Sequence, residues 1–163
     1  MNVIQRIDSW AQRDPQRVAY NYLGKENTYL ELKNYSDSVA AAITNMDLPD
    51  KAPIIVYGGQ EFEMIAVFLG IVKTGHAYIP IDSDSPSERL VTINRIAQPV
   101  ACIAVEELPV ELAGLPVVTP PAKLKQLFSE RVSFSAANQV KGSDVFYIIF
   151  TSGTTGVPKG GPN

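Results

Sequence analysis

The sequence predicts an α/β fold, a mostly parallel sheet with flanking helices. Apolar strand-like segments alternate with helical segments over residues 53–105. Strands that alternate with helices of this length favour a parallel sheet with right-handed crossovers. Hydrophobic residues make up 45% of the 163 residues and charged residues 19%, which is ordinary for a globular domain. A chain of this length can bury one core, so we expect a single compact domain.

The first part of the chain carries two helix starts and one strand. Each helix start is a capping box, in which two residues lie three positions apart. The side chain of each accepts a hydrogen bond from the backbone N–H of the other. The two pairs are Asn2 with Gln5 and Thr28 with Glu31. The first helix is expected to end at Asp14-Pro15, and the second to run to Met46. Residues 17–23 predict a strand, followed by a turn at Gly24.

Two strand–helix–strand units are expected next, with strands at residues 53–57, 77–81 and 100–105. The helix of the second unit should start at Ser85 as the cap, with Pro86 at its first position and Glu88 at its third. Further on, residues 145–150 form a continuous apolar run, which is typical of a strand buried on both faces.

Bulk properties exclude several functions. The net charge of −3 gives no basic field for a nucleic-acid backbone. No apolar stretch approaches the roughly 18 residues of a membrane span, and no signal peptide is apparent, so a cytoplasmic protein is expected. The only cysteine, Cys102, lies in an apolar run and should fill the core. The pair Glu106-Glu107 is interpreted as a solvated loop.

The chemistry is concentrated in residues 151–160, Thr-Ser-Gly-Thr-Thr-Gly-Val-Pro-Lys-Gly. Glycines let backbone N–H groups turn toward an anion, hydroxyls add donors, and Lys159 adds a point charge. A strand that leads into such a loop is a common nucleotide site. The segment is neither a Walker A loop nor a Gly-x-Gly-x-x-Gly fingerprint. The competing interpretation is a polar loop that merely joins two elements.

Three segments resemble, in order, motifs of the adenylate-forming (AMP-binding) superfamily. Residues 147–160 resemble its phosphate-loop signature, and residues 27–32 resemble the first core motif of amino-acid adenylation domains. Residues 72–82, with Pro86 and Arg89, resemble the second core motif. The resemblance implies that residues 1–160 are part of the large N-terminal domain of an adenylate-forming ligase and end at the phosphate loop.

Within the superfamily, residues 56–61 and Gly75-His76 resemble the D-alanine–D-alanyl carrier protein ligases. This resemblance implies activation of D-alanine by ATP as D-alanyl-AMP. Transfer to the phosphopantetheine thiol of a D-alanyl carrier protein then serves lipoteichoic acid D-alanylation. His76 is expected to be packed or hydrogen-bonded and is not assigned as a catalytic base. The alternatives are a peptide-synthetase-like adenylation domain, an acyl-CoA synthetase, or a non-catalytic nucleotide-binding or interaction fragment.

The resemblance also implies roles for the phosphate-loop residues. Hydroxyl donors to the β- and γ-phosphates are Thr151, Ser152, Thr154 and Thr155. Close backbone approach is allowed at Gly153, Gly156 and Gly160. Lys159 neutralises charge, and Mg²⁺ is bound through the phosphates, with no protein residue assigned as a metal ligand.

In the superfamily, the residues for adenine, ribose, the amino acid and the reacting carboxylate lie downstream of the phosphate loop. We therefore expect this chain to hold one arm of an active site and to lack ligase activity alone. Residues 161–163, Gly-Pro-Asn, depart from the family pattern. A frameshift and a short cloning tail are the two explanations for this aberrant tail.

Overall fold

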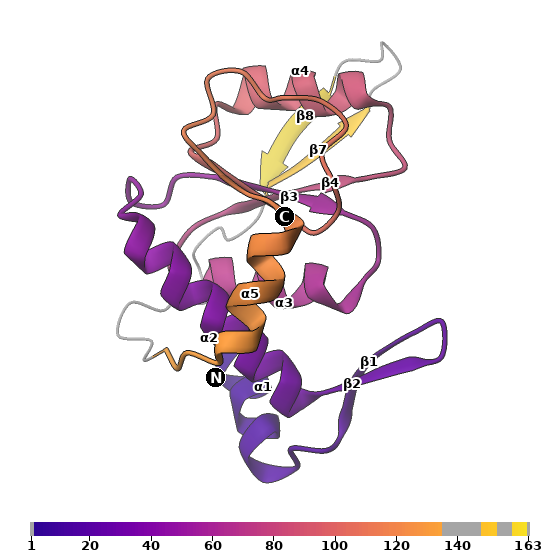
Figure 1. The fold of residues 1–163 in the computed structure, drawn as a ribbon, viewed down its shortest axis with the longest axis vertical. Helices are drawn as coiled ribbons and strands as arrows, with labels where there is room; N and C mark the ends of the chain where they lie inside the picture. Colours follow the sequence, from indigo (N-terminus) through magenta and orange to yellow (C-terminus); the bar gives the residue numbers. More distant parts are fainter. Residues whose placement is uncertain (1, 135–147, 153–157, 163) are drawn as a thin grey trace.

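The computed structural model describes residues 2–134, 148–152 and 158–162. Figure 1 shows helices on both sides of a central sheet, with one hairpin extending away from the body and a second lying near α4. The helices are α1 (Val3–Arg13), α2 (Tyr29–Met46), α3 (Phe62–Lys73), α4 (Ser87–Ala97) and α5 (Pro121–Glu130). The strands are β1 (Val18–Tyr22), β2 (Lys25–Thr28), β3 (Ile54–Gly58), β4 (Tyr78–Asp82), β5 (Ala101–Ala104), β6 (Val117–Thr119), β7 (Ile148–Ser152) and β8 (Pro158–Pro162).

The central sheet has the order β4-β3-β5-β6, and each neighbouring pair is parallel. Val56 of β3 lies opposite Pro80 of β4 and Ile103 of β5. This arrangement confirms the predicted α/β class and the parallel sheet. The three predicted strands of this sheet are correct to within one or two residues at each end.

Alternate residues of β3 and β5 face two separate hydrophobic clusters. Val56 and Ile103 belong to the cluster that α2, α3 and α5 cover, whereas Tyr57 and Cys102 belong to the cluster that α4 covers. Figure 1 shows these helices on opposite sides of the sheet. Since side chains alternate along a strand, a strand with helices on both faces must be apolar throughout. This is why β3 reads as a continuous apolar run.

Both predicted capping boxes are present. The Asn2 side chain accepts from the Gln5 N–H at 2.8 Å, and the Gln5 side chain accepts from the Asn2 N–H at 3.0 Å. Thr28 and Glu31 make the equivalent pair at 3.2 and 2.9 Å. Both helix starts could be predicted from the sequence because each capping box lies within four consecutive residues.

The predicted start of α4 is wrong. The helix begins at Ser87, and Pro86 precedes it in an extended conformation (φ −57°, ψ 144°) with no side-chain cap. The Ser85 N–H instead donates to the Asp82 carbonyl at 3.0 Å. Ser85 therefore belongs to the turn that follows β4, which the sequence pattern did not distinguish from a cap.

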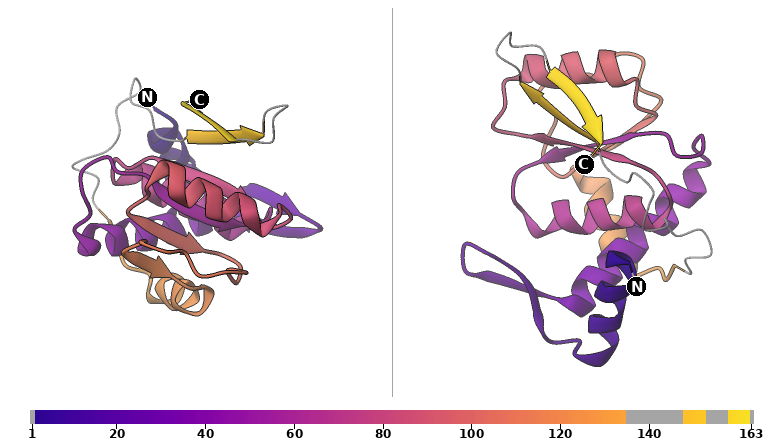
Figure 2. Two further views of the ribbon diagram at one scale, coloured as in Figure 1. Left: turned by 90° about the horizontal axis from the view of Figure 1, so that it is seen from above. Right: turned by 180° about the vertical axis from the view of Figure 1, so that it is seen from behind.

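The prediction of a single strand at residues 17–23 missed half of a hairpin. Strand β2 pairs antiparallel with β1, and Tyr22 lies opposite Lys25. The turn consists of Leu23 and Gly24, with φ values of 52° and 84°. Positive φ at both positions is the geometry of a type I′ turn, for which Asn-Gly is the usual sequence. Both views in Figure 2 show this hairpin extending from the body.

The end of the described chain is an antiparallel hairpin. Strand β7 begins at Ile148 and continues two residues beyond the predicted end of the strand, and its partner β8 was not predicted. Residues 145–147 of the predicted strand lie outside the described residues. Strand β7 contacts β4, and β8 contacts α4, which places the hairpin beside the end of the sheet where β4 lies (Figure 2).

Within the described ranges, no helix is both long and apolar enough to cross a bilayer.

Candidate functional site

The predicted phosphate loop is built on the β7–β8 hairpin. Backbone pairing places Thr151 opposite Lys159, Ser152 opposite Pro158, and Phe150 opposite Gly160. Thr151, Ser152, Lys159 and Gly160 are therefore parts of strands, which corrects the expectation of a continuous loop. The antiparallel ladder brings the lysine position next to the hydroxyl-bearing positions although Lys159 lies eight positions after Thr151 in the sequence. The remaining predicted site residues, Gly153, Thr154, Thr155 and Gly156, lie outside the described residues.

Pro158 occupies the first position of β8. Proline cannot donate to a strand ladder and is tolerated at the first residue of a strand. In the Val-Pro-Lys-Gly end of the motif, the proline thus begins the strand and the lysine is the next residue.

A second polar region lies where the strands of the central sheet end. Glu61 follows β3, Asp82 to Asp84 end and follow β4, and Glu106 follows β5. Together they line a crevice of about 440 Å³ with Tyr22, Gly59, Gln60 and Ser83. Open parallel sheets bind ligands at their carboxyl ends, where neighbouring strands lead away in opposite directions. Strands β3 and β5 lie side by side and lead to β4 and β6 on opposite sides, so the crevice lies at such a point.

Of the pair interpreted as a solvated loop, Glu107 is exposed as expected, whereas Glu106 is half-buried in this crevice. The Ser83 hydroxyl donates to Glu106 Oε2 at 2.9 Å, and the Gly59 N–H donates to Glu61 Oε1 at 2.6 Å. A hydrogen bond with Glu61 raises the pKa of Glu106, and burial adds to the increase. No local sequence signal could reveal this contact, because Glu61 lies in the connection from β3 to α3 and Glu106 in the connection from β5 to β6.

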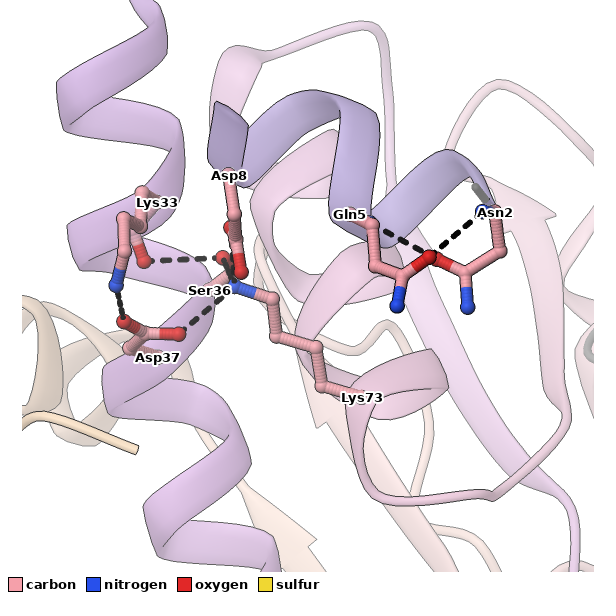
Figure 3. A network of polar contacts seen from close by, with 7 residues as sticks. All are labelled: Asn2, Gln5, Asp8, Lys33, Ser36, Asp37 and Lys73. Carbon is pink, nitrogen blue, oxygen red and sulfur yellow. Dashed lines mark hydrogen bonds and ion pairs between the residues drawn. The ribbon is translucent and has the colours of Figure 1, made fainter. Parts of the chain in front are cut away.

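Lys73, within the second resemblance segment, is the most deeply buried charged residue among those described, with 1% of its side chain exposed. Its Nζ lies 2.7 Å from Asp37, 3.0 Å from the Ser36 hydroxyl and 3.1 Å from Asp8. Asp37 also binds Lys33 through its other oxygen at 2.5 Å. Figure 3 shows these side chains converging from α1, α2 and α3. The network joins three helices and has the character of a structural anchor.

The other two single-residue expectations are confirmed. His76 is buried, and its Nδ1 lies 2.9 Å from the Ala52 carbonyl oxygen. Because a carbonyl only accepts, Nδ1 carries the proton in this contact. Cys102 is buried in β5, and burial raises the pKa of its thiol to about 12.

The parallel α/β sheet and the hairpin that carries residues 148–152 and 158–162 lie within a family match: residues 7–161 match the AMP-binding enzyme family. The chain belongs to this family. It is 55% identical over 159 residues to a D-alanine--D-alanyl carrier protein ligase from Lactiplantibacillus plantarum. It is 46% identical over 159 residues to the ligase of that name from Streptococcus pneumoniae. Each match covers 98% of this chain and 31% of the relative, so the chain spans about a third of the relatives' length.

Solved structures share the fold. The complex of VinN with 3-methylaspartate superposes with a TM-score of 0.82 at 23% identity, covering 98% of this chain and 46% of that one. The N-terminal subdomain of Klebsiella oxytoca NpsA gives a TM-score of 0.80 at 24% identity, covering 98% and 41%. The described elements therefore share the fold of these structures, and the chain covers less than half of each.

Proposed function

We propose that the chain supplies the phosphate-binding arm of an ATP-dependent ligase. The ligase activates D-alanine and transfers it to the phosphopantetheine thiol of a D-alanyl carrier protein. The observation that carries this proposal is the match to relatives named D-alanine--D-alanyl carrier protein ligase over 98% of the chain. Membership of the AMP-binding enzymes supports ATP as the nucleotide.

In the first step, a carboxylate oxygen of D-alanine attacks the α-phosphorus of ATP, and pyrophosphate leaves. D-Alanyl-AMP then reacts with the carrier thiol, and AMP leaves. Charge grows on the departing pyrophosphate, so positioned donors and a cation lower the barrier chiefly by electrostatic stabilisation. The proposed donors are the hydroxyls of Thr151, Ser152, Thr154 and Thr155, and the proposed cation is Lys159.

Residues 151–160 contain hydroxyls, glycines and a lysine but no carboxylate. This donor set fits phosphate oxygens and does not form a metal cage. Mg²⁺ would therefore be held through the phosphates, where it neutralises part of their charge. Gly153, Gly156 and Gly160 would allow the backbone to approach the phosphate oxygens closely. We place the reaction in the cytoplasm, in the D-alanylation of lipoteichoic acid.

The experiment joins residues 1–160 of this chain to the remaining part of the L. plantarum relative. The chimera should exchange pyrophosphate into ATP in the presence of D-alanine. Lys159→Ala should lower this exchange at least about tenfold, which is ~1.4 kcal/mol of transition-state stabilisation. Lys125→Ala, which alters an exposed lysine of α5, is the matched control and should leave the rate unchanged.

Near-normal exchange by the Lys159→Ala chimera would contradict the role of the lysine. The same segment joined to the downstream part of a peptide-synthetase adenylation domain tests the main alternative. Greater activity in that chimera than in the D-alanine ligase chimera would favour a peptide-synthetase-like protein. ATP binding without exchange in either chimera would favour a non-catalytic nucleotide-binding fragment.

A further inference from the structure

The outer face of α1 carries a row of basic and aromatic side chains. Arg6, Trp10 and Arg13 follow one another at spacings of four and three residues, so they share one face of the helix. Val3, which is 51% exposed, lies on the same face one turn earlier. Both arginines are exposed, and Trp10 is partly buried. This face of α1 is therefore accessible to a partner.

Trp10 is the centre of a stack that brings in a further arginine from beyond the helix. The Arg17 guanidinium carbon lies 4.3 Å from the centroid of the Trp10 ring, and that of Arg13 lies 5.1 Å from it. Tyr29, the first residue of α2, stacks on the same indole with ring centroids 6.0 Å apart. Cation–π contacts of this kind hold the arginines in place. We define Val3, Arg6, Trp10, Arg13 and Arg17 as the α1 stripe.

The α1 stripe is positively charged, although the chain as a whole has a net charge of −3. None of the ion pairs formed within the described part of the chain includes an arginine of the stripe. Asp8 of the same helix points toward Lys73, and its Oδ1 lies 3.1 Å from the lysine Nζ (Figure 3). Asp14, at the C-terminal cap, is the other acidic residue of the segment. One carboxylate therefore stands against three guanidinium groups.

The composition of the α1 stripe favours a protein partner over a membrane surface. Arginine and tryptophan are enriched at protein interfaces and carry much of the binding energy there. Because stacking already restricts Trp10 and Arg17, ordering them in an interface costs less entropy. A membrane-binding helix turns its apolar face outward, whereas the apolar side of α1 is buried at Ile4 and Ala11. The Trp10 ring, covered by Arg17 and Tyr29, is not free to enter a lipid layer.

We propose that the α1 stripe docks an acidic helix of a partner protein. Arg6 and Arg13 are seven residues apart, which is two helical turns, or about 10.5 Å along the axis. A helix that lies along α1 and has carboxylates seven residues apart places one carboxylate at each arginine. Arginine binds carboxylates through two parallel hydrogen bonds, and Trp10 contacts the partner helix between the two pairs. This interaction is independent of the proposed ligase function.

The test uses the fluorescence of Trp10, which is the only tryptophan in the sequence and so reports on the α1 stripe directly. The probe is an alanine-based helical peptide of about 20 residues, with glutamates seven residues apart and no tryptophan. Titration of the full 163-residue chain with this peptide should change the Trp10 emission until it saturates. Added salt should weaken the binding, because the contacts join exposed charges.

The variants separate the stripe from general charge attraction. Arg6→Gln and Arg13→Gln should each weaken binding about threefold, the effect of one exposed ion pair, and the double variant should weaken it about tenfold. Arg95→Gln, at an exposed arginine of α4, is the matched control and should leave the affinity unchanged. A peptide of the same composition, with its glutamates on different faces of the helix, should bind about threefold more weakly.

Three results would overturn the proposal. The first is no saturable change with the peptide, or equal affinity for the two acidic peptides. The second is binding to phosphatidylglycerol vesicles without binding to the peptide, which would assign the α1 stripe to a membrane surface. The third concerns the chimera with the remaining part of the L. plantarum relative, which should bind a fluorescently labelled peptide with the same affinity. Loss of binding there would show that the downstream part covers the stripe.

Discussion

At the scale of single residues, stability depends on charges that are buried with their partners. Lys73 is enclosed by Asp8, Ser36 and Asp37, and Asp37 lies between Lys73 and Lys33. Removal of one member of a buried pair leaves an uncompensated charge, whereas removal of an exposed partner costs little. Lys73 should therefore contribute more to stability than Lys33, although both bind Asp37.

Lys73→Ala should destabilise the protein by about 3–5 kcal/mol, because it leaves the Asp37 carboxylate buried without its main partner. Lys33→Ala, at a lysine that is 35% exposed, should cost less than about 1 kcal/mol. Urea unfolding of the two variants and the wild type measures both values. Equal losses would show that burial does not distinguish the two ion pairs.

The Cys102 thiol should be chemically inert in the folded protein. Burial raises its pKa to about 12, so the reactive thiolate is scarce at neutral pH. Because the pKa of the thiol is higher in the folded state than in the unfolded state, the protonated thiol favours folding. This contribution to stability is lost only as the pH rises toward about 12. A thiol reagent at neutral pH should modify Cys102 only as fast as the protein opens, and rapidly in urea. Rapid native-state modification would contradict the buried position.

At the scale of elements, the least favourable local sequence is at the tip of the β1–β2 hairpin. Leu23 has φ 52° and is 87% exposed. A branched apolar residue in the left-handed region is strained, and this one gains no packing in return. The hairpin is nevertheless formed, because Tyr20 of β1 stacks on Tyr22 and its hydroxyl donates to the Gln60 carbonyl at 2.6 Å.

Leu23→Asn should stabilise the protein by about 0.5–1 kcal/mol, since Asn-Gly is the preferred sequence for a type I′ turn. Gly24→Ala should have the opposite effect, because Gly24 has φ 84° and no neighbouring atom within 4 Å that a methyl group could contact. Thermal unfolding of the two variants checks the prediction. A lower melting temperature for Leu23→Asn would show that Leu23 makes a contact that its exposure conceals.

At the scale of the whole molecule, stability should depend on pH through the crevice. The hydrogen bond with Glu61 raises the pKa of Glu106 in the folded state. A raised carboxyl pKa contributes stability that is complete below the unfolded-state value and is lost as the pH rises through the folded-state value. The wild type should therefore lose stability relative to Glu106→Gln as the pH rises above the ordinary glutamate pKa. Urea midpoints of the two proteins that remain parallel across this range would contradict the prediction.

Much of the fold could be predicted because its signals are local. The capping boxes of α1 and α2 connect residues three apart, and the apolar run of β3 reflects burial by helices on both faces. Strand β2 escaped prediction because Lys-Glu-Asn-Thr has no apolar alternation, and only pairing with β1 makes it a strand. Strand β8, rich in glycine and proline, depends in the same way on β7.

The sequence by itself determined the α/β class, the family and the position of the phosphate-loop motif, because each is written in consecutive residues. Only the tertiary structure decided which distant polar groups meet. Lys73 binds Asp8 across 65 residues, and Ser83 binds Glu106 across 23. The phosphate-loop lysine likewise stands opposite Thr151 because of the β7–β8 ladder. Contacts of this kind depend on how the sheet and the helices pack. A pattern of consecutive residues does not specify which side chains from distant parts of the chain meet.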